Sequence, residues 1–237
     1  MTHYRAVGDI PRKRHAVHRG ADGTRRHEEL LGVRGFSGPS ALLYHRNSPS
    51  SVEAIDGLAP RPGDGALAPV QPVAPVHLRT RDLDREVGDS EDGVAAVDLV
   101  TGRRVLVGNR DVRIGVALAG GPSPLYRTAV GDEVVFVAEG SATLETVFGA
   151  LAVTTGDYVV VPAGVTHRWV PHGPLRALVI EASGHVEIPR RYRSDEGQML
   201  EHAPFCERDL RAPTEPLVVD DDGPVDVVVR TAAGMSR

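Results

Sequence analysis

Cysteine is almost absent from this chain, and its scarcity limits the chemistry that the fold can use. Cys206 is the single cysteine in 237 residues, so no disulfide can form within the chain and a reducing compartment is indicated. The amino terminus lacks the apolar segment of a secretion signal, and no apolar run is long enough to cross a membrane. We therefore expect a cytoplasmic protein without a membrane partner.

Positive charge is also in short supply. The 27 Lys and Arg residues are outnumbered by 32 Asp and Glu, which gives a formal net charge of −5. A nucleic-acid partner is disfavoured, because binding to phosphates depends on a positive surface. The one dense basic run, at residues 11–15, is expected to be a solvated segment or a subunit contact.

Helical patterns of useful length are missing between residues 94 and 183, whereas turn residues are plentiful. The chain contains 26 Gly and 18 Pro, and this region consists of short β-branched runs that each end at a Gly or Pro turn. Turns at intervals of roughly 8–12 residues are typical of a sandwich or barrel whose strands are joined by antiparallel hairpins. The sequence predicts an all-β fold, an antiparallel jelly roll with irregular N-terminal and C-terminal extensions.

Composition divides the chain into three parts. Residues 1–93 are expected to be an N-terminal extension that packs on the barrel, with short strands and a proline-rich connection. Residues 94–188 are expected to form the jelly roll. Residues 189–237 are expected to be an irregular segment that ends in a hairpin and leads toward a further domain.

Four local elements are expected in the two extensions. HEELLG at 27–32 is a short helical candidate, and SALLYHR at 40–46 is typical of a strand. Five prolines at 57–76 exclude a helix and a central strand, so this stretch should be an irregular connection. The run DDDGP at 220–224 is expected to be the turn between two terminal strands.

One motif in the barrel region has the spacing of a metal-ligand motif. Gly156, Pro162, Gly164 and His167 have the spacing G-x5-P-x-G-x2-H. At every fixed position this stretch resembles the second motif of the cupins, which are jelly-roll metalloenzymes. The glycines and the proline make the turns, and the histidine then points into the barrel. The predicted fold is therefore a cupin-like β-sandwich.

The first cupin motif, G-x5-H-x-H-x3-4-E-x6-G, is only half present. Glu133 and Gly140 match its second half. Its two histidine positions hold Arg127 and Ala129 at the shorter spacing, or Tyr126 and Thr128 at the longer. Two of the four ligand positions therefore keep a ligand, and the cupin is degenerate.

Two ligands are too few for a catalytic iron site, which uses two histidines and one carboxylate. We therefore predict no catalytic residue and no functional metal in this barrel, and an interior filled by Arg127, Glu133, His167 and Trp169. A buried carboxylate needs compensation, so an Arg127–Glu133 pair is expected to replace the cation, with His167 as the other candidate partner. An enzyme that uses Glu133, His167 and an unexpected third ligand is the alternative.

Other groups of metal-ligating residue types are interpreted as structural or surface polar residues. They are His202, Cys206 and Glu207; His15 and His18; and His185 with Glu187. Cys206 lacks an evident base other than His202, so a nucleophilic role is disfavoured.

Segments along nearly the whole chain resemble one family. They are residues 7–15, 28–38, 40–46, 131–149, 156–169, 180–192 and 197–213, of which the last two are the most specific. In these segments the chain resembles the amino-terminal half of homogentisate 1,2-dioxygenase, especially its bacterial members. The resemblance implies an oxidoreductase of tyrosine and phenylalanine catabolism, which opens the ring of homogentisate with oxygen and Fe(II) to give maleylacetoacetate.

The resemblance also implies where the chemistry resides. In that family an amino-terminal β domain precedes a carboxy-terminal cupin-like domain that holds the iron ligands and the base histidine. No iron ligand is therefore carried over to this chain, which is expected to bind no Fe(II) and to be inactive alone. Subunits of the family form trimers or hexamers, so we expect a homo-oligomer with a small aromatic acid as substrate. Glu28, Glu29 and Tyr44 are candidate subunit-interface residues.

Two further interpretations of the chain stay open, in addition to an enzyme that uses Glu133, His167 and an unexpected third ligand. The first is a homogentisate dioxygenase whose catalytic half is missing through truncation, a frameshift or a split gene. The second is a stand-alone, non-catalytic cupin that serves as a binding or assembly module.

Overall fold

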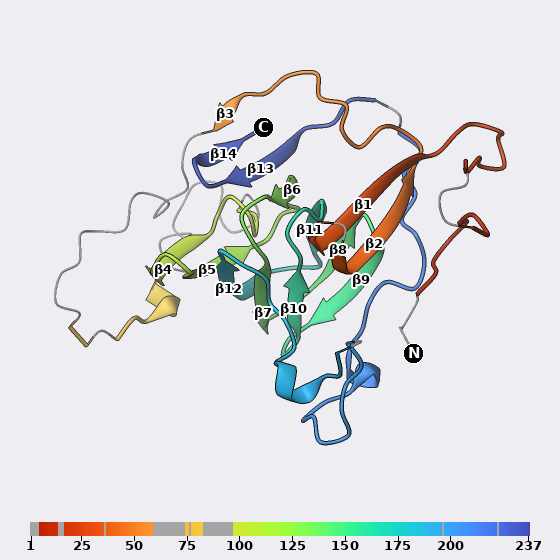
Figure 1. The fold of residues 1–237 in the computed structure, drawn as a ribbon. Helices are drawn as coiled ribbons and strands as arrows, with labels where there is room; N and C mark the ends of the chain where they lie inside the picture. Colours follow the sequence, from red (N-terminus) through yellow and green to blue (C-terminus); the bar gives the residue numbers. More distant parts are fainter. Residues whose placement is uncertain are drawn as a thin grey trace. The chain divides into compact units, whose positions relative to one another are not determined.

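The computed structural model describes residues 5–13, 17–35, 37–58, 74–75, 77–82, 97–195, 197–221 and 223–237. Within these ranges nearly every regular element is a strand (Figure 1). The chain forms two compact units, each built from separate stretches of sequence. The smaller unit contains Met1–Val52, Phe148–Ala150 and Val186–Asp222, and the larger contains Glu53–Val147, Leu151–His185 and Gly223–Arg237. The linear division at residues 93 and 188 stays a prediction.

Two sheets contain the strands of the barrel. One has five strands in the order β10-β7-β12-β5-β4. They are Tyr158–Val161, Glu133–Glu139, Leu175–Ala182, Val112–Ala119 and Arg104–Gly108. The other has seven strands in the order β3-β14-β13-β6-β11-β8-β9. They are Gly57–Leu58, Gly234–Ser236, Val227–Thr231, Leu125–Thr128, His167–Pro171, Ser141–Thr146 and Gly149–Thr154.

Side chains alternate between the core and the outer surface along these strands. In β12, Leu175, Ala177, Val179 and Glu181 are buried, while the residues that alternate with them are half-buried. In β6, Tyr126 and Thr128 are completely buried. A period of two is the geometry of a strand with one face on the core, so polar residues at core positions are brought inside with the apolar ones.

The helix expected at 27–32 is wrong. His27–Arg34 forms strand β1, which pairs antiparallel with β2, Ser37–His45. Leu30 lies opposite Leu42 in this pair, so cross-strand packing favours the extended backbone over the helical propensity of the segment. The strand expected at 40–46 coincides with β2 to within a few residues.

The terminal hairpin lies later than expected. Residues 217–221 are not in a strand, and the hairpin is formed by β13 and β14 around residues 232–233. The reason is that β13 pairs parallel with β6 of the seven-stranded sheet, with Val228 opposite Tyr126. This long-range pairing has no local signal comparable to the turn sequence at 220–224.

Helix is scarce among the described residues, as expected. The helical elements are two short 3₁₀ turns, Arg190–Tyr192 and Glu207–Asp209, and residues 80–82 are also helical. No helix in the described part of the chain is long and apolar enough to cross a membrane. The proline-rich connection expected at 57–76 lies largely outside the described residues, and its first two residues form β3.

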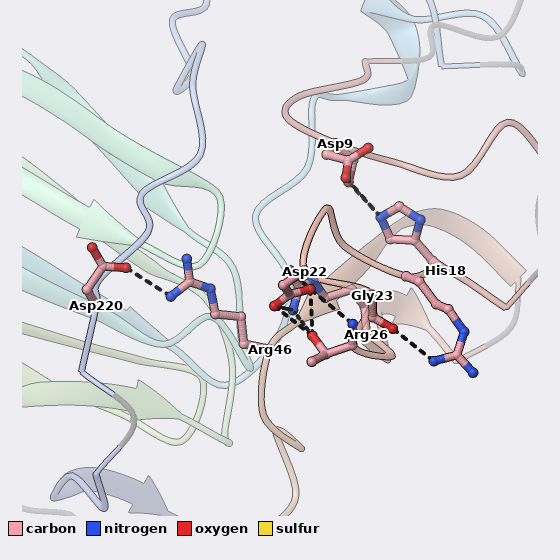
Figure 2. Close-up of polar contacts among 9 residues, drawn as sticks. Asp9, His18, Asp22, Gly23, Arg26, Arg46 and Asp220 are labelled. Atoms are coloured by element: carbon pink, nitrogen blue, oxygen red, sulfur yellow. Dashed lines mark hydrogen bonds and ion pairs between the residues drawn. The ribbon is translucent and has the colours of Figure 1, made fainter.

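Polar contacts link distant segments within the smaller unit (Figure 2). Arg46 Nη1 donates to Asp220 Oδ1 at 3.0 Å. His18 Nε2 lies 3.1 Å from the Asp9 carbonyl oxygen, and its ring meets Tyr44 edge-on with centroids 5.1 Å apart. The His18 side chain is 9% exposed, so its interpretation as a surface residue is wrong. His15 lies outside the described residues.

Candidate functional site

The turn before β11 fixes where His167 enters the barrel. Gly164 has a φ of 84°, a left-handed conformation that glycine adopts without strain, and its N–H donates to the Thr128 carbonyl at 2.8 Å. The Ala163 N–H donates to Oδ1 of the buried Asp132 at 2.8 Å. Because two hydrogen bonds hold the turn, His167 begins β11 with its side chain fully buried.

His167 is neutral and has one nitrogen without a partner. Its Nδ1 lies 3.0 Å from the Val165 carbonyl oxygen, which can only accept, so Nδ1 carries the proton and Nε2 carries a lone pair. Nε2 is buried and has no hydrogen-bond partner among the described residues. Burial lowers the pKa of His167 and outweighs the opposing attraction of Glu133. The imidazole is therefore the stable form.

Glu133, at the start of β7, is a fully buried and ionised carboxylate. Arg103 donates from Nη1 to Oε1 at 2.7 Å and from Nη2 to Oε2 at 3.0 Å. The Tyr126 hydroxyl donates to Oε1 at 2.7 Å. Burial raises the pKa of Glu133, but Arg103 outweighs burial and the resulting pKa is about 2. Both oxygens of this carboxylate are thus occupied by donors from the protein.

Arg103 reaches the barrel interior from a turn that precedes β4. Asp98 holds the turn by accepting from the backbone N–H of Val100 at 2.6 Å and of Thr101 at 2.9 Å. Arg103 Nε then donates to the Leu99 carbonyl at 2.7 Å, and the residue is 2% exposed. Burial works against the charge of Arg103, but the negative charge of Glu133 raises its pKa further above the ordinary value.

A second carboxylate and a second guanidinium extend the network. Arg103 Nη1 also donates to Oε1 of Glu181 on β12, at 3.0 Å. Oε2 of Glu181 lies 3.2 Å from Nη2 of Arg230 on β13. The four side chains carry two positive and two negative charges, so the buried network is neutral. Neutrality matters because an uncompensated buried ion costs several kcal/mol.

Tyr126 links the charges to His167. Its ring lies edge-on to the His167 ring, with centroids 5.3 Å apart and planes at 83°, and Arg103 Cζ lies 5.2 Å from the tyrosine centroid. Burial raises the pKa of Tyr126, and the neighbouring Glu133 raises it further. The phenol therefore stays protonated and acts as a donor to Glu133.

The expected Arg127–Glu133 pair is wrong, because β6 follows the longer spacing of the first cupin motif. Tyr126 and Thr128 face the core, and strand alternation directs Arg127 to the opposite side. Arg127 is half-buried, and its Nε donates to Thr166 Oγ1 at 2.9 Å. The guanidinium that neutralises Glu133 comes from Arg103.

Sequence reasoning missed three members of the network: Arg103, Glu181 and Arg230. Glu181 had a usable signal, because it continues the inward-facing series Leu175, Ala177 and Val179 of one strand. Arg103 lies in a turn, and Arg230 lies on a strand whose parallel pairing with β6 is long-range. Neither position has a periodicity that distinguishes it from a solvated arginine.

The residues at the cupin ligand positions do not fit a catalytic metal. Tyr126 and Thr128 stand where two histidines would be, and Glu133 already accepts three hydrogen bonds from Arg103 and Tyr126. Among the described residues, no group of three or more His, Cys, Asp or Glu side chains is placed to hold a metal ion. Nε2 of His167 is the ligand-type nitrogen at these positions that has no hydrogen-bond partner among the described residues. No catalytic step through a metal can be derived from these residues.

The candidate interface residues lie together on the β1–β2 ribbon of the smaller unit. Glu28 is opposite Tyr44 in the register, and Glu29 Oε2 lies 2.8 Å from Nε2 of His45. Glu28 also lines a hollow of about 380 Å³ whose walls include Arg25 and Arg26. Their role at a subunit interface stays a prediction.

The remaining candidate groups make local structural contacts. His202 Nε2 donates to the Arg191 carbonyl at 2.8 Å, Glu207 accepts from the Met199 N–H at 2.9 Å, and the Cys206 N–H donates to Asp209. His185 is exposed, as expected. Its Nδ1 lies 3.3 Å from Oδ1 of the buried Asp132, so it supports the turn that positions His167.

Comparison with known proteins includes a match over nearly the whole chain. Over 236 residues the chain is 28% identical to a protein of Saccharolobus solfataricus that is named "Putative dioxygenase", and the match covers 99% of this chain and 58% of that protein. The chain thus spans less than two thirds of the length of this relative.

Solved structures with a similar fold include two bacterial proteins. A cupin-2 domain containing protein of Shewanella frigidimarina is 24% identical, with 34% of this chain and 78% of that chain covered and a TM-score of 0.32. A conserved protein of unknown function from Streptococcus pyogenes is 21% identical, with 52% and 100% covered and a TM-score of 0.37. Residues 116–181 also match the family model of the cupin domain. This match, together with the two antiparallel-rich sheets, confirms the predicted jelly roll as a cupin fold.

Proposed function

We propose that this chain is the non-catalytic scaffold half of a cupin-type dioxygenase. A cupin domain and a relative with a dioxygenase name indicate a cupin-type oxygenase or binding protein. The scaffold role is favoured because Arg103 neutralises Glu133 in the barrel, where a catalytic cupin would use its carboxylate as a metal ligand. That ion pair is the observation on which the proposal depends.

The proposed reaction is the oxidative ring opening of homogentisate, or of a closely similar small aromatic acid. Support comes from the resemblance of residues 180–192 and 197–213 to homogentisate 1,2-dioxygenase. In this proposal Fe(II) is held by a carboxy-terminal domain outside this chain, consistent with a relative of which the chain spans 58%. Assembly into a trimer or hexamer, and residence in the cytoplasm, belong to the same proposal.

A binding or assembly module is the second candidate function. The observation that favours it is the lone pair on His167 Nε2, which is buried in the barrel without a partner among the described residues. A small polar ligand that donates one hydrogen bond would satisfy this atom. Such a ligand would bind without any redox chemistry.

Oxygen uptake with homogentisate tests the proposed function. The purified chain is reconstituted with Fe(II) under anaerobic conditions, desalted, and assayed for bound iron and for oxygen consumption. We expect less than a tenth of an equivalent of iron and no substrate-dependent uptake, because both Glu133 oxygens are already paired with the Arg103 guanidinium. Stoichiometric iron together with turnover by the chain alone would refute the scaffold role.

The coding sequence provides an independent check. Reading the DNA beyond codon 237 in all frames should reveal a histidine-rich cupin domain if the chain is half of a dioxygenase. Adding that domain to this chain should then give iron-dependent oxygen uptake. A purified two-part protein that binds iron but leaves homogentisate and oxygen unconsumed would rule out this substrate.

A further inference from the structure

The contacts around Arg103 use every nitrogen of its guanidinium group. Nη1 donates to one oxygen of Glu133 and one of Glu181, Nη2 donates to the other oxygen of Glu133, and Nε donates to the Leu99 carbonyl. All four distances lie between 2.7 and 3.0 Å. The surrounding acceptors therefore match the planar, three-sided donor pattern of a guanidinium ion.

An aromatic face completes this environment. The Tyr126 ring centroid lies 5.2 Å from Arg103 Cζ, within the range of a cation–π contact. Tyr126, Glu133 and Glu181 are at most 4% exposed, so solvent does not screen the attraction. We name this environment the guanidinium cage: the Leu99 carbonyl, Tyr126, Glu133 and Glu181.

We propose that the guanidinium cage is a binding site for planar guanidinium cations, and that Arg103 fills it from within the chain. The inference rests on the proposed scaffold function, since a resident guanidinium takes the charge-compensating role that a metal has in a catalytic cupin. It goes further by assigning the chemical class of the occupant. A free guanidinium ion should enter the cage once the Arg103 side chain is removed.

The cage selects shape as well as charge. An ammonium group is a compact point charge, and it cannot donate to both Glu133 oxygens and to the Leu99 carbonyl from one position. A divalent metal would need several ligands close to one point, whereas no such group of ligating side chains is present among the described residues. Nε2 of His167 is a hydrogen-bond acceptor without a partner among the described residues, and Arg103 does not donate to it. A cation with additional N–H donors could use this acceptor.

The test is chemical rescue of the Arg103→Ala variant. Its thermal unfolding is followed by circular dichroism with increasing guanidinium chloride up to about 20 mM, far below denaturing concentrations, against matched NaCl and urea series. Once guanidinium reaches ten times its Kd, the unfolding midpoint should rise by roughly 3–6 °C. The wild-type protein should show no such rise. The Arg103→Ala, Glu133→Gln double variant should lose the rescue, because half of the anionic cage is gone.

Each alternative outcome is informative. Equal effects of guanidinium and NaCl, or the same rescue in the double variant, would overturn the cage. A saturable rescue by Mn²⁺ or Zn²⁺ but not by guanidinium would show a site for compact charge and would also overturn it. If Arg103→Ala does not fold in buffer, its refolding yield is compared in guanidinium and in urea, and recovery in neither refutes the proposal.

Failure of the cage and failure of the proposed function can be told apart. Absence of rescue would leave the iron and oxygen measurements on the wild-type chain unchanged. Conversely, iron-dependent turnover by the wild-type chain would refute the scaffold function whether or not Arg103→Ala is rescued by guanidinium.

Discussion

Arg103 and Glu133 form a two-point ion pair in the barrel core, with Nη1 to Oε1 at 2.7 Å and Nη2 to Oε2 at 3.0 Å. The two side chains are 2% and 0% exposed. The pair connects the turn before β4 with the first residue of β7. In a cupin fold it takes the place of the bond between carboxylate and metal, so it should matter for stability far more than a surface ion pair does.

Replacing Glu133 with Gln should therefore be strongly destabilising. The substitution leaves Arg103 buried with one carboxylate fewer, and breaking a buried pair in this way costs about 3–5 kcal/mol. Urea denaturation monitored by circular dichroism measures the loss. Glu145→Gln is the matched control, because it removes a carboxylate from a partly exposed pair with Arg168, where about 0–1 kcal/mol is expected. Similar losses in the two variants would contradict the role assigned to the buried pair.

Glu133 should also give the protein a distinct acid sensitivity. Its pKa in the folded state is about 2, below its ordinary value of 4.5. The unfolded chain binds the proton more tightly, so the stabilisation is complete above pH 4.5 and is lost as the pH falls toward 2. The free energy of unfolding is measured across this window. In Glu133→Gln the decrease should be smaller than in the wild type, and an unchanged slope would refute the assignment.

His167 should act in a separate, higher pH window. Its pKa is lowered from 6.5 by burial, so the unfolded chain takes up the proton first as the pH falls. Its contribution to stability is present above pH 6.5 and declines as the pH drops below that value. His167→Gln keeps a polar side chain but cannot titrate, and it should flatten the stability profile just below pH 6.5. A profile identical to that of the wild type would show that His167 is not a buried neutral group.

Most strands of the barrel could be predicted from the sequence, because the patterns that indicate a strand lie within a few neighbouring residues. Alternation such as that of Leu175, Ala177 and Val179 reports a strand with one buried face, and the glycine and proline turns report where strands end. The same reasoning predicted a helix in the β1 segment, which is wrong because pairing with strand β2 determines its conformation. The parallel pairing of β13 with β6 could not be predicted from local sequence patterns, because the paired residues are separated by about a hundred positions in the chain.

The site was only partly predictable, because its chemistry depends on which side chains the fold brings together. Glu133 and His167 were identified from motif spacing, but a difference of one residue in that spacing decides whether Arg127 or Tyr126 faces the core. Arg103 approaches from a turn and is recognised only by its hydrogen bonds to Glu133 and Glu181. Three-dimensional structure is therefore required to learn what compensates the buried charge.

The two glycines at the ends of neighbouring turns offer a matched test of packing. Gly140 and Gly156 have φ values of 91° and 94°, so an alanine at either position is strained by about 1–2 kcal/mol. They differ in their surroundings. A Cβ at Gly140 would lie 2.4 Å from the Pro174 carbonyl oxygen, whereas a Cβ at Gly156 would meet no atom within 4 Å.

Gly140→Ala should therefore lose more stability than Gly156→Ala, since the backbone at Pro174 must move to relieve the clash while the strain of the left-handed conformation is common to both. Urea midpoints of the two variants give the comparison, with the Gly156 variant as the measure of strain alone. Because Pro174 immediately precedes β12, the movement should also reach Leu175 at the start of that strand. Faster amide exchange along β12 in the Gly140 variant alone is the expected signature. Equal midpoints and equal exchange would mean that the close approach at Gly140 does not constrain the barrel.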